Sequence, residues 1–350
     1  MSEFWFGKRV LITGHTGFKG SWLSLWLAQM GAQVFGYSLM PDTSPALFNQ
    51  LSLVEEMDHQ IGDIRDLAQL QDSFERVQPD VVFHLAAQPL VLASFDDPLT
   101  TWNTNVIGSA NVMEAARKLK EKCAMVMVTT DKVYENREWT YPYREIDPLG
   151  GHDPYSASKA AMELAIESWR KSFFHRGSAL RMASARAGNV IGGGDWSENR
   201  IIPDLIRSLQ SGTALSVRNP NAIRPWQHVL DPLSGYLQLA EHLFNSSDLV
   251  YQSSFNFGPE AYDAKPVRDL IDEALQHWPG AWIDASDQDK RHEAKTLSLT
   301  IEKARSVLGV HPRLGLKESI EMTMQWYKTV VENGNPREIT KAQIMTYSGL

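Results

Sequence analysis

The sequence predicts an α/β fold built on a doubly wound parallel sheet, followed by a smaller lobe of mixed α/β structure. Three observations predict it: short apolar runs alternate with longer helical patterns, a glycine-rich turn follows the first run, and glycine and proline become frequent beyond residue 186. Runs that are apolar on both faces suit the buried strands of a parallel sheet. Strands that alternate with helices need crossover connections, which place helices on both faces.

The predicted strands are compact apolar runs at residues 10–13, 33–37, 81–85 and 125–128. Helices are predicted at residues 18–30, 105–119 and 155–174. The chain has 350 residues, enough for two units. We therefore divide it into a sheet domain, residues 1–187, and a lobe, residues 188–350, and expect the helical run at 229–250 to pack back on the sheet domain.

The composition favours a globular enzyme in the cytoplasm. Apolar residues make up 43% and charged residues 22% of the chain, and the net charge of −8 argues against a nucleic-acid partner. Cys123 is the only cysteine, and the histidines lack ligand spacing, so we expect neither a disulfide nor a metal site. We also expect no signal peptide and no membrane partner, because no apolar stretch approaches the about 18 residues that span a bilayer.

A glycine-rich turn follows the first predicted strand. Gly14, Gly17 and Gly20 have G-x-x-G-x-x-G spacing and lead into a helical pattern. In such a turn the glycines allow a tight bend, close approach of a pyrophosphate and close packing of helix on strand, while the helix N-terminus attracts the phosphates. The turn therefore predicts a Rossmann-type dinucleotide-binding domain, against the alternative of a glycine loop without a ligand. The turn residues expected to contact the dinucleotide are Gly14, His15, Thr16, Gly17, Phe18, Lys19 and Gly20.

The carboxylate that usually holds the adenosine ribose is missing after the second strand. Residues 35–39 contain no acidic residue, and the next one is Asp42. This position therefore leaves the choice between NAD and NADP open. Asp63, which lies between the strands predicted at 33–37 and 81–85, is either a contact to the adenine or a loop aspartate without a ligand.

Tyr155 and Lys159 begin a helical pattern and lie four residues apart, which places them on one helix face. An ammonium group near a phenol lowers its pKa and makes it a usable acid or base. Such a pair alone is common on helices. Its position after the strand at 125–128, about 140 residues beyond the glycine turn, favours a catalytic role.

Together these features resemble the extended short-chain dehydrogenase/reductase family over nearly the whole chain. The matching segments are the turn at 14–20, His84 to Ala87, Asn105, and the Tyr155/Lys159 pair. Residues 129–134, TTDKVY, resemble the T-D-x-V-Y segment of nucleotide-sugar 4,6-dehydratases within that family. The members that act on dTDP-glucose usually carry glutamate where this chain has Lys132. The lysine and the turn TGHTGFKGSWL resemble the members that act on CDP-glucose.

The resemblance implies NAD as cofactor and a reaction in three stages: oxidation at C4 of the sugar, loss of water across C5 and C6, and return of hydride to C6. By this resemblance Tyr155, supported by Lys159, takes the proton of the C4 hydroxyl. Lys132 takes the C5 proton, and Asp131 protonates the C6 hydroxyl. Thr130 hydrogen-bonds to the C4 oxygen. A lysine base has to be neutral, which requires burial or a neighbouring cation. The alternative for residues 131 and 132 is a solvated charge pair in a loop.

The resemblance also implies further contacts. It adds to the cofactor site Asp63, Ile64, Leu85, Ala86, Ala87, Asn105, Tyr155 and Lys159. It assigns to the substrate Gln88, Asn189, Arg200, Arg224 and Arg291. An arginine fork suits a diphosphate, and a solvated surface position is the alternative for each arginine.

A homodimer is expected through the helices at 105–119 and 155–174, which carry apolar residues on more than one face. A wide buried face within one subunit is the alternative.

Two other functions stay open. A nucleotide-sugar 4-epimerase would keep the turn, Tyr155 and Lys159 but would need no acid–base pair at residues 131 and 132. A non-catalytic dinucleotide-binding protein would be free to lose Tyr155 or Lys159, and this chain has both. The sequence alone does not show which residues would recognise the nucleotide base of the substrate.

Overall fold

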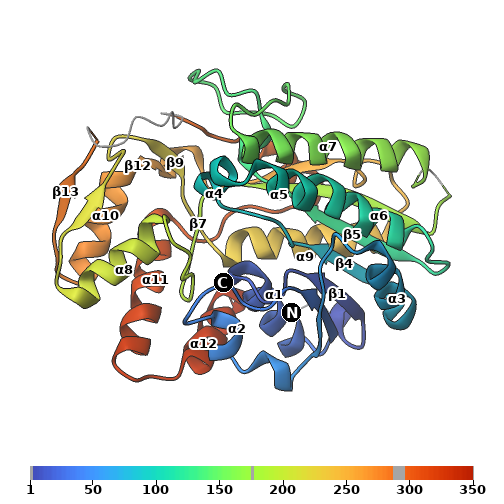
Figure 1. The fold of residues 1–350 in the computed structure, drawn as a ribbon, viewed down its shortest axis with the longest axis horizontal. Helices are drawn as coiled ribbons and strands as arrows, with labels where there is room; N and C mark the ends of the chain where they lie inside the picture. The colour runs from blue at the N-terminus through green and yellow to red at the C-terminus, as the bar shows by residue number, and fades with distance from the viewer. Residues whose placement is uncertain (1–2, 175–176, 287–295, 350) are drawn as a thin grey trace.

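A seven-stranded parallel sheet forms the centre of the computed structural model, which describes residues 3–174, 177–286 and 296–349 (Figure 1). Its strands lie in the order β11-β6-β5-β4-β1-β2-β3. Their bounds are β1 Arg9–Thr13, β2 Gln33–Ser38, β3 Asp58–Ile61, β4 Val81–His84, β5 Cys123–Val128, β6 Leu180–Ala187 and β11 Ser254–Phe257. The order reverses between β1 and β4, and ligands of open α/β sheets bind at the carboxyl ends of strands at such a point.

Helices cover both faces of this sheet and explain why its strands are apolar on both sides. Side chains of Val10 and Ile12 join one core, which includes α1 and α9, while Leu11 joins the other, which includes α3, α6 and α7. Successive strand residues point to opposite faces, so both sets need apolar side chains. The helices are α1 Phe18–Gln29, α3 Leu67–Val77, α6 Ser109–Ala116, α7 Pro154–Ser172 and α9 Leu230–Asn245.

The predicted fold class is confirmed, and the predicted elements lie within two residues of the observed ones in most cases. An exception is the helix expected at 105–119, which begins instead as a π-helical segment, Asn103–Gly108, before α6. Helix α9 lies against β5 and β6. The seventh strand, β11, comes from beyond residue 188 and pairs with β6. Its sequence, SFNF, contains no compact apolar run of the kind that marks the predicted strands.

The C-terminal part contains short strands in two-stranded pairs, β7 with β10, β9 with β12 and β8 with β13, besides helices. These strands are β7 Val190–Ile191, β8 Leu215–Val217, β9 Ile223–Pro225, β10 Gln227–His228, β12 Ala264–Pro266 and β13 Trp282–Asp284. The helices are α8 Ile201–Ser211, α10 Val267–His277, α11 Leu316–Val331 and α12 Pro336–Gly349, and the shorter helices α2 Leu47–Gln50, α4 Val91–Asp96 and α5 Pro98–Trp102 lie in the first half.

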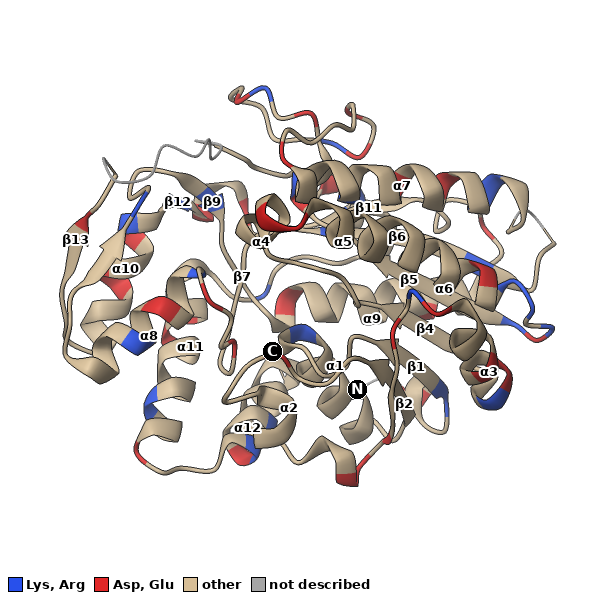
Figure 2. Cartoon of the chain, in the orientation of Figure 1, with Lys and Arg blue, Asp and Glu red and all other residues tan. Residues whose placement is uncertain are grey.

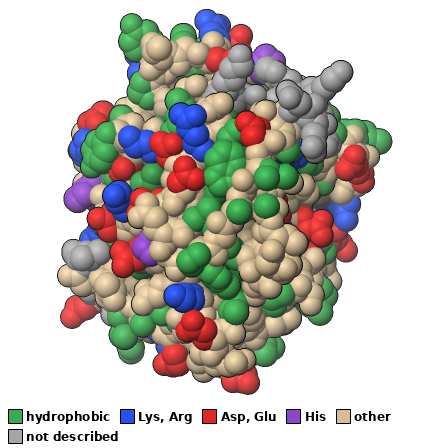
Figure 3. All heavy atoms as spheres, turned by 90° about the vertical axis from the view of Figure 1, so that its left-hand side faces the viewer, with side chains coloured by type: hydrophobic (Ala, Val, Ile, Leu, Met, Phe, Trp, Pro, Cys, Tyr) green, Lys and Arg blue, Asp and Glu red, His purple; other side chains and the backbone are tan. Residues whose placement is uncertain are grey.

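Charged residues of both signs are spread over the helices and loops (Figure 2). On the face that Figure 3 presents, they alternate with apolar side chains. Among the described residues, no helix is both long and apolar enough to span a bilayer.

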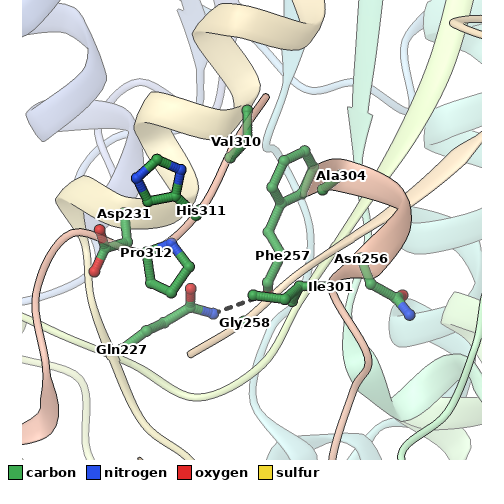
Figure 4. Close-up of a pocket in the computed structure, with 10 residues that line it drawn as sticks. All are labelled: Gln227, Asp231, Asn256, Phe257, Gly258, Ile301, Ala304, Val310, His311 and Pro312. Carbon is green, nitrogen blue, oxygen red and sulfur yellow. Dashed lines mark hydrogen bonds between the residues drawn. The ribbon is translucent and has the colours of Figure 1, made fainter. Parts of the chain in front are cut away.

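A small cavity lies between α9, β11 and residues 301–312, with Gln227, Asp231 and Phe257 in its wall (Figure 4). The amide of Gln227 donates to the Phe257 carbonyl at 3.1 Å. Oδ1 of Asp231 accepts from the Tyr347 hydroxyl at 2.8 Å and from the Arg313 N–H at 2.9 Å. Asp231 therefore fastens α12 to α9, and none of the sequence-predicted site residues lines this cavity.

Candidate active site

The glycine turn connects β1 to α1, and a side chain at each of its three glycines would meet different surroundings. Gly14 has φ +78°, and a Cβ on it would lie 2.6 Å from the Ala86 nitrogen. A Cβ on Gly20 would lie 2.2 Å from the Gly14 carbonyl oxygen. The exposed Gly17 differs, because a Cβ there would make only an ordinary contact of 3.5 Å. Packing within the chain therefore requires Gly14 and Gly20, whereas Gly17 leaves the main chain open to an outside group.

Helix α1 begins directly after Gly17 with no side chain capping its N-terminus. Lys19 lies in its first turn, and no described residue forms a hydrogen bond or an ion pair with its amine. Burial lowers the pKa of Lys19 to about 8, and Arg200 acts in the same direction. An uncapped helix start and a partly enclosed amine fit a pyrophosphate, so these residues suit a dinucleotide such as NAD.

The segment after β4 forms the neighbouring wall. The Leu85 N–H donates to the Thr13 carbonyl at 3.0 Å, and the Ala86 N–H donates to the Thr13 hydroxyl oxygen at 3.3 Å. Both ring nitrogens of the buried His84 are engaged, Nδ1 with Thr13 at 2.7 Å and Nε2 with Ser109 at 2.8 Å. His84 thereby fixes this wall beside the turn.

The position that usually carries the ribose-binding carboxylate lies at the end of β2, and Asp63 follows β3. Ser38 stands where a carboxylate was expected, and its hydroxyl lies 2.8 Å from that of Thr16. Asp63 forms a bidentate pair with Arg65. Nε2 of His15 lies 2.6 Å from Nδ1 of His59, whereas Nδ1 of His15 has no hydrogen-bond partner in the described part of the chain. The cofactor contact of His15 stays a prediction.

Residues 129–134 follow β5 and bring the predicted acid into a buried position. Asp131 is 2% exposed, and its Oδ1 accepts a hydrogen bond from Thr130 at 2.9 Å. Its Oδ2 has no partner within the described part of the chain. Burial raises the pKa of Asp131, although Lys132, Thr130 and Arg224 oppose the change. Asp131 is therefore not part of a solvated charge pair in a loop. Lys132, next to it, is half-buried.

Tyr155 and Lys159 lie near the start of α7, whose N-terminus is capped by Asp153. Both side chains are buried, and Thr130, Asp131 and Arg200 all act on the Tyr155 phenol. Burial raises the pKa of Tyr155 to about 12, while Thr130 and Arg200 lower it. The lowering expected from Lys159 is therefore not the dominant effect. The Lys159 amine instead lies 3.5 Å from the Val128 carbonyl.

Two of the substrate arginines reach this cluster. Arg200 pairs with Asp195 at 2.9 Å and acts on both Tyr155 and Lys19. The buried Arg224 lowers the pKa of Asp131 and so lies near that carboxyl group. Cations from both halves of the chain therefore surround the predicted acid.

Other predicted contacts are engaged elsewhere or stay open. The Gln88 amide donates to Thr101 at 2.8 Å and accepts from the Leu90 N–H at 2.6 Å, so this side chain is used within the protein. The Asn105 amide bridges the Gln88 backbone and the Ser158 hydroxyl. The Asn189 side chain has no hydrogen-bond partner in the described ranges, and Arg291 lies outside the described residues.

Two residues beside this site were missed by sequence reasoning. Asp195, which holds Arg200, has no local signal. Glu163 lies four residues after Lys159 on the same face of α7, and this spacing was visible in the sequence. Across residues 3–174, 177–286 and 296–349, no group of three or more histidine, cysteine, aspartate or glutamate side chains could hold a metal ion.

Comparison with known proteins places this geometry in context. Residues 10–252 match the model of the NAD dependent epimerase/dehydratase family. Over 351 aligned residues the chain is 45% identical to CDP-glucose 4,6-dehydratase of Salmonella typhimurium, with 99% of this chain and 97% of that protein covered.

Solved structures show the same fold at lower identity. UDP-glucose 4-epimerase of Thermotoga maritima with UDP-glucose aligns with a TM-score of 0.79 and 21% identity, over 92% of this chain and 99% of that one. The dTDP-glucose 4,6-dehydratase of Bacillus anthracis in complex with NAD aligns with a TM-score of 0.76 and 20% identity, over 94% and 99%.

Proposed function

The chain belongs to the NAD dependent epimerase/dehydratase family, and we propose that it converts CDP-D-glucose to CDP-4-dehydro-6-deoxy-D-glucose and water. The observation that carries this proposal is the buried Asp131, with Lys132 next to it, in the same cluster as Tyr155. An epimerase needs the tyrosine and lysine pair alone, whereas elimination of water needs both an acid and a base. The 45% identity to a CDP-glucose 4,6-dehydratase supports the same reaction.

NAD fits the turn at residues 14–20. The main chain at Gly17, the uncapped start of α1 and the amine of Lys19 suit its pyrophosphate. Ser38 and Asp63, at the ends of β2 and β3, lie where the adenosine would be held. When bound, NAD would supply a reversible hydride acceptor, which takes the hydride from C4 of the sugar and returns it to C6.

Tyr155 takes the C4 hydroxyl proton, with Thr130 and Arg200 lowering its pKa and Lys159 one helical turn along. Its pKa of about 12 shows that burial alone disfavours the phenolate. Nearby positive charge is therefore needed at the moment of proton transfer.

Lys132 and Asp131 then divide the elimination between them. The C4 ketone makes the C5 proton acidic, and Lys132 removes it. Asp131 protonates the C6 hydroxyl, which leaves as water. Burial favours the protonated form of Asp131, as a general acid requires, and Oδ2 is the oxygen free to donate.

The substrate diphosphate is assigned to Arg200, Arg224 and Asn189, which come from the part of the chain beyond residue 188. The two arginines already lie near the catalytic residues. A guanidinium fork binds phosphate oxygens in pairs. The division into a cofactor domain at 1–187 and a substrate lobe at 188–350 rests on this arrangement.

A cytoplasmic homodimer is part of the proposal. Large apolar side chains lie exposed on the adjoining surfaces of α5, the π-helical segment and α7: Leu99 at 75%, Trp102 at 41%, Ile107 at 53% and Leu164 at 64%. A second copy of the chain would cover them.

The deciding experiment incubates the protein with NAD and, separately, CDP-, dTDP-, UDP- and GDP-glucose. The 4-keto product is measured by its absorbance in alkali. We expect product from CDP-glucose above the other three. A C4 epimer without 4-keto product would favour the epimerase, and no turnover of any sugar would contradict the assignment.

A further inference from the structure

A buried carboxylate lies one helical turn beyond Lys159. Glu163 of α7 is 3% exposed and lies on the same helix face as Tyr155 and Lys159. Its two oxygens accept hydrogen bonds from the Thr129 hydroxyl at 2.6 Å, the Ser184 hydroxyl at 2.8 Å and Nε and Nη2 of Arg186 at 3.0 and 2.8 Å.

We propose that Glu163 is a positioning residue, whose charge stabilises the Lys159 ammonium from the next turn of α7 and whose hydrogen bonds tie together the chain segments that carry the catalytic residues. This inference rests on the proposed roles of Tyr155 and Lys159. It adds a group that no step of the proposed reaction uses directly.

The hydrogen bonds of Glu163 involve both chain segments that are assigned to the substrate. Thr129, which donates to it, immediately precedes Thr130. Arg186 also donates to the Tyr134 hydroxyl at 2.9 Å, at the other end of residues 129–134. Arg186 stands three residues before Asn189. A change at this carboxylate would therefore change how α7 is positioned relative to residues 129–134 and residues 186–189.

The charges around Lys159 single out Glu163. Burial lowers the pKa of Lys159 to about 8, and the Glu163 carboxylate raises it. From β4, His84 faces the same amine, but burial lowers the pKa of His84 to about 3, so that ring is neutral. Lys19, from the start of α1, is a second cation that couples to Lys159. Among the described residues, Glu163 is thus the anion that raises the pKa of Lys159.

Glu163 is itself ionised. Burial alone would raise its pKa, but the Arg186 charge and the hydrogen bonds of Arg186, Thr129 and Ser184 lower it. A buried ion pair is weak evidence for a gain in stability. The position of Glu163 one helical turn from Lys159, together with its hydrogen bonds to Thr129 and Arg186, favours a role in positioning.

The test is a titration of the Lys159 amine in protein labelled with ¹³C at the lysine ε-carbon. The Lys159 signal is assigned by its loss in Lys159→Arg. In Glu163→Gln we expect the pKa of Lys159 to fall by about 1 to 2, because a carboxylate one turn away is lost. The alkaline limb of the kcat profile should move down by a similar amount.

Two further variants separate positioning from folding. Glu163→Gln leaves Arg186 buried without its partner and can fail to fold. The double variant Glu163→Gln/Arg186→Met removes both charges and should show a fall in the pKa of Lys159 that is smaller than in the single variant, because the Arg186 cation is lost as well. Ser184→Ala removes a donor to Glu163 but keeps the charge, and should lower the melting temperature without moving the pKa of Lys159.

An unchanged Lys159 pKa in the double variant would overturn the inference and leave Glu163 a structural residue. The titration needs neither NAD nor a sugar. A failure of the CDP-glucose assignment would therefore leave its outcome readable.

Discussion

The Thr130 hydroxyl donates a hydrogen bond of 2.9 Å to Oδ1 of Asp131, and both side chains are buried. This bond fixes one oxygen of the carboxyl group as an acceptor. A proton on the acid is therefore held on Oδ2, the oxygen that has no partner within the described ranges. The acidic proton of Asp131 therefore lies on the carboxyl oxygen that has no acceptor among the described residues.

Replacing Asp131 by Asn tests this directly. The amide oxygen can still accept from Thr130, but the side chain can no longer give up a proton. We expect turnover to fall by about 10² to 10⁴, while C4 oxidation still appears as nicotinamide absorbance in a single turnover. Loss of the absorbance change together with turnover would mean that Asp131 serves binding or folding instead.

Tyr155→Phe should lower turnover by several orders of magnitude, because the C4 hydroxyl loses its proton acceptor. NAD binding, measured by fluorescence titration, should remain largely intact. Tyr141→Phe is the matched control, since Tyr141 is 73% exposed in a loop, and should behave as the parent protein. Equal activity in the Tyr155 variant would refute the role given to this residue.

The exposed apolar side chains of α5 and α7 make the oligomeric state testable. Leu164→Glu places a charge at a position that is 64% exposed, so the single chain should still fold. We expect light scattering after size exclusion to show a dimer for the parent protein and a monomer for this variant. Leu249→Glu, at a position 51% exposed outside these helices, should remain dimeric. A monomeric parent protein would contradict the proposed interface.

Asp231 predicts a pH dependence of stability. Burial raises its pKa to about 6, against about 3.9 in an unfolded chain. The folded state therefore binds the proton more tightly, and the stability gained from protonation is fully present below pH of about 4 and lost as the pH rises through about 6.

Asp231→Asn cannot ionise, yet its amide oxygen can still accept from Tyr347 and Arg313. We expect the variant to be more stable than the parent at pH 7 by about 1 to 3 kcal/mol in urea unfolding, with the difference vanishing at low pH. Asp269→Asn, an exposed control, should change stability by no more than about 0.5 kcal/mol. A less stable variant at pH 7 would mean that the charged form of Asp231 is favoured in the folded protein.

Much of the first half of the chain could be predicted, because the sequence patterns of its strands, helices and glycine turn are local. The turn at residues 14–20 joins a strand to a helix within a few residues, and packing within the chain requires Gly14 and Gly20. Each predicted strand contains a compact apolar run that marks it. Strand β11 has the sequence SFNF, in which polar and apolar residues alternate over only four positions, so it contains no such run.

The candidate side chains were harder to place. His15 was assigned to the cofactor by its position in the turn, and its ring also bonds to His59, which lies 44 residues away in the sequence. Gln88 was assigned to the substrate, and its amide also bonds to Thr101 and Leu90. Both assignments stay predictions. Which partner a polar side chain takes depends on what folding brings beside it, and a motif does not carry that information.

Local patterns were enough to predict the parallel sheet, the dinucleotide turn and the pairing of Tyr155 with Lys159, because strand alternation and the turn of a helix are set over a few residues. Folding of the whole chain was needed to bring Asp131 and Arg200 close to both Tyr155 and Lys19, and to pair Glu163 with Arg186. Their charges and pKa values follow from burial and from neighbours far away along the chain, and both exist only once the chain has folded.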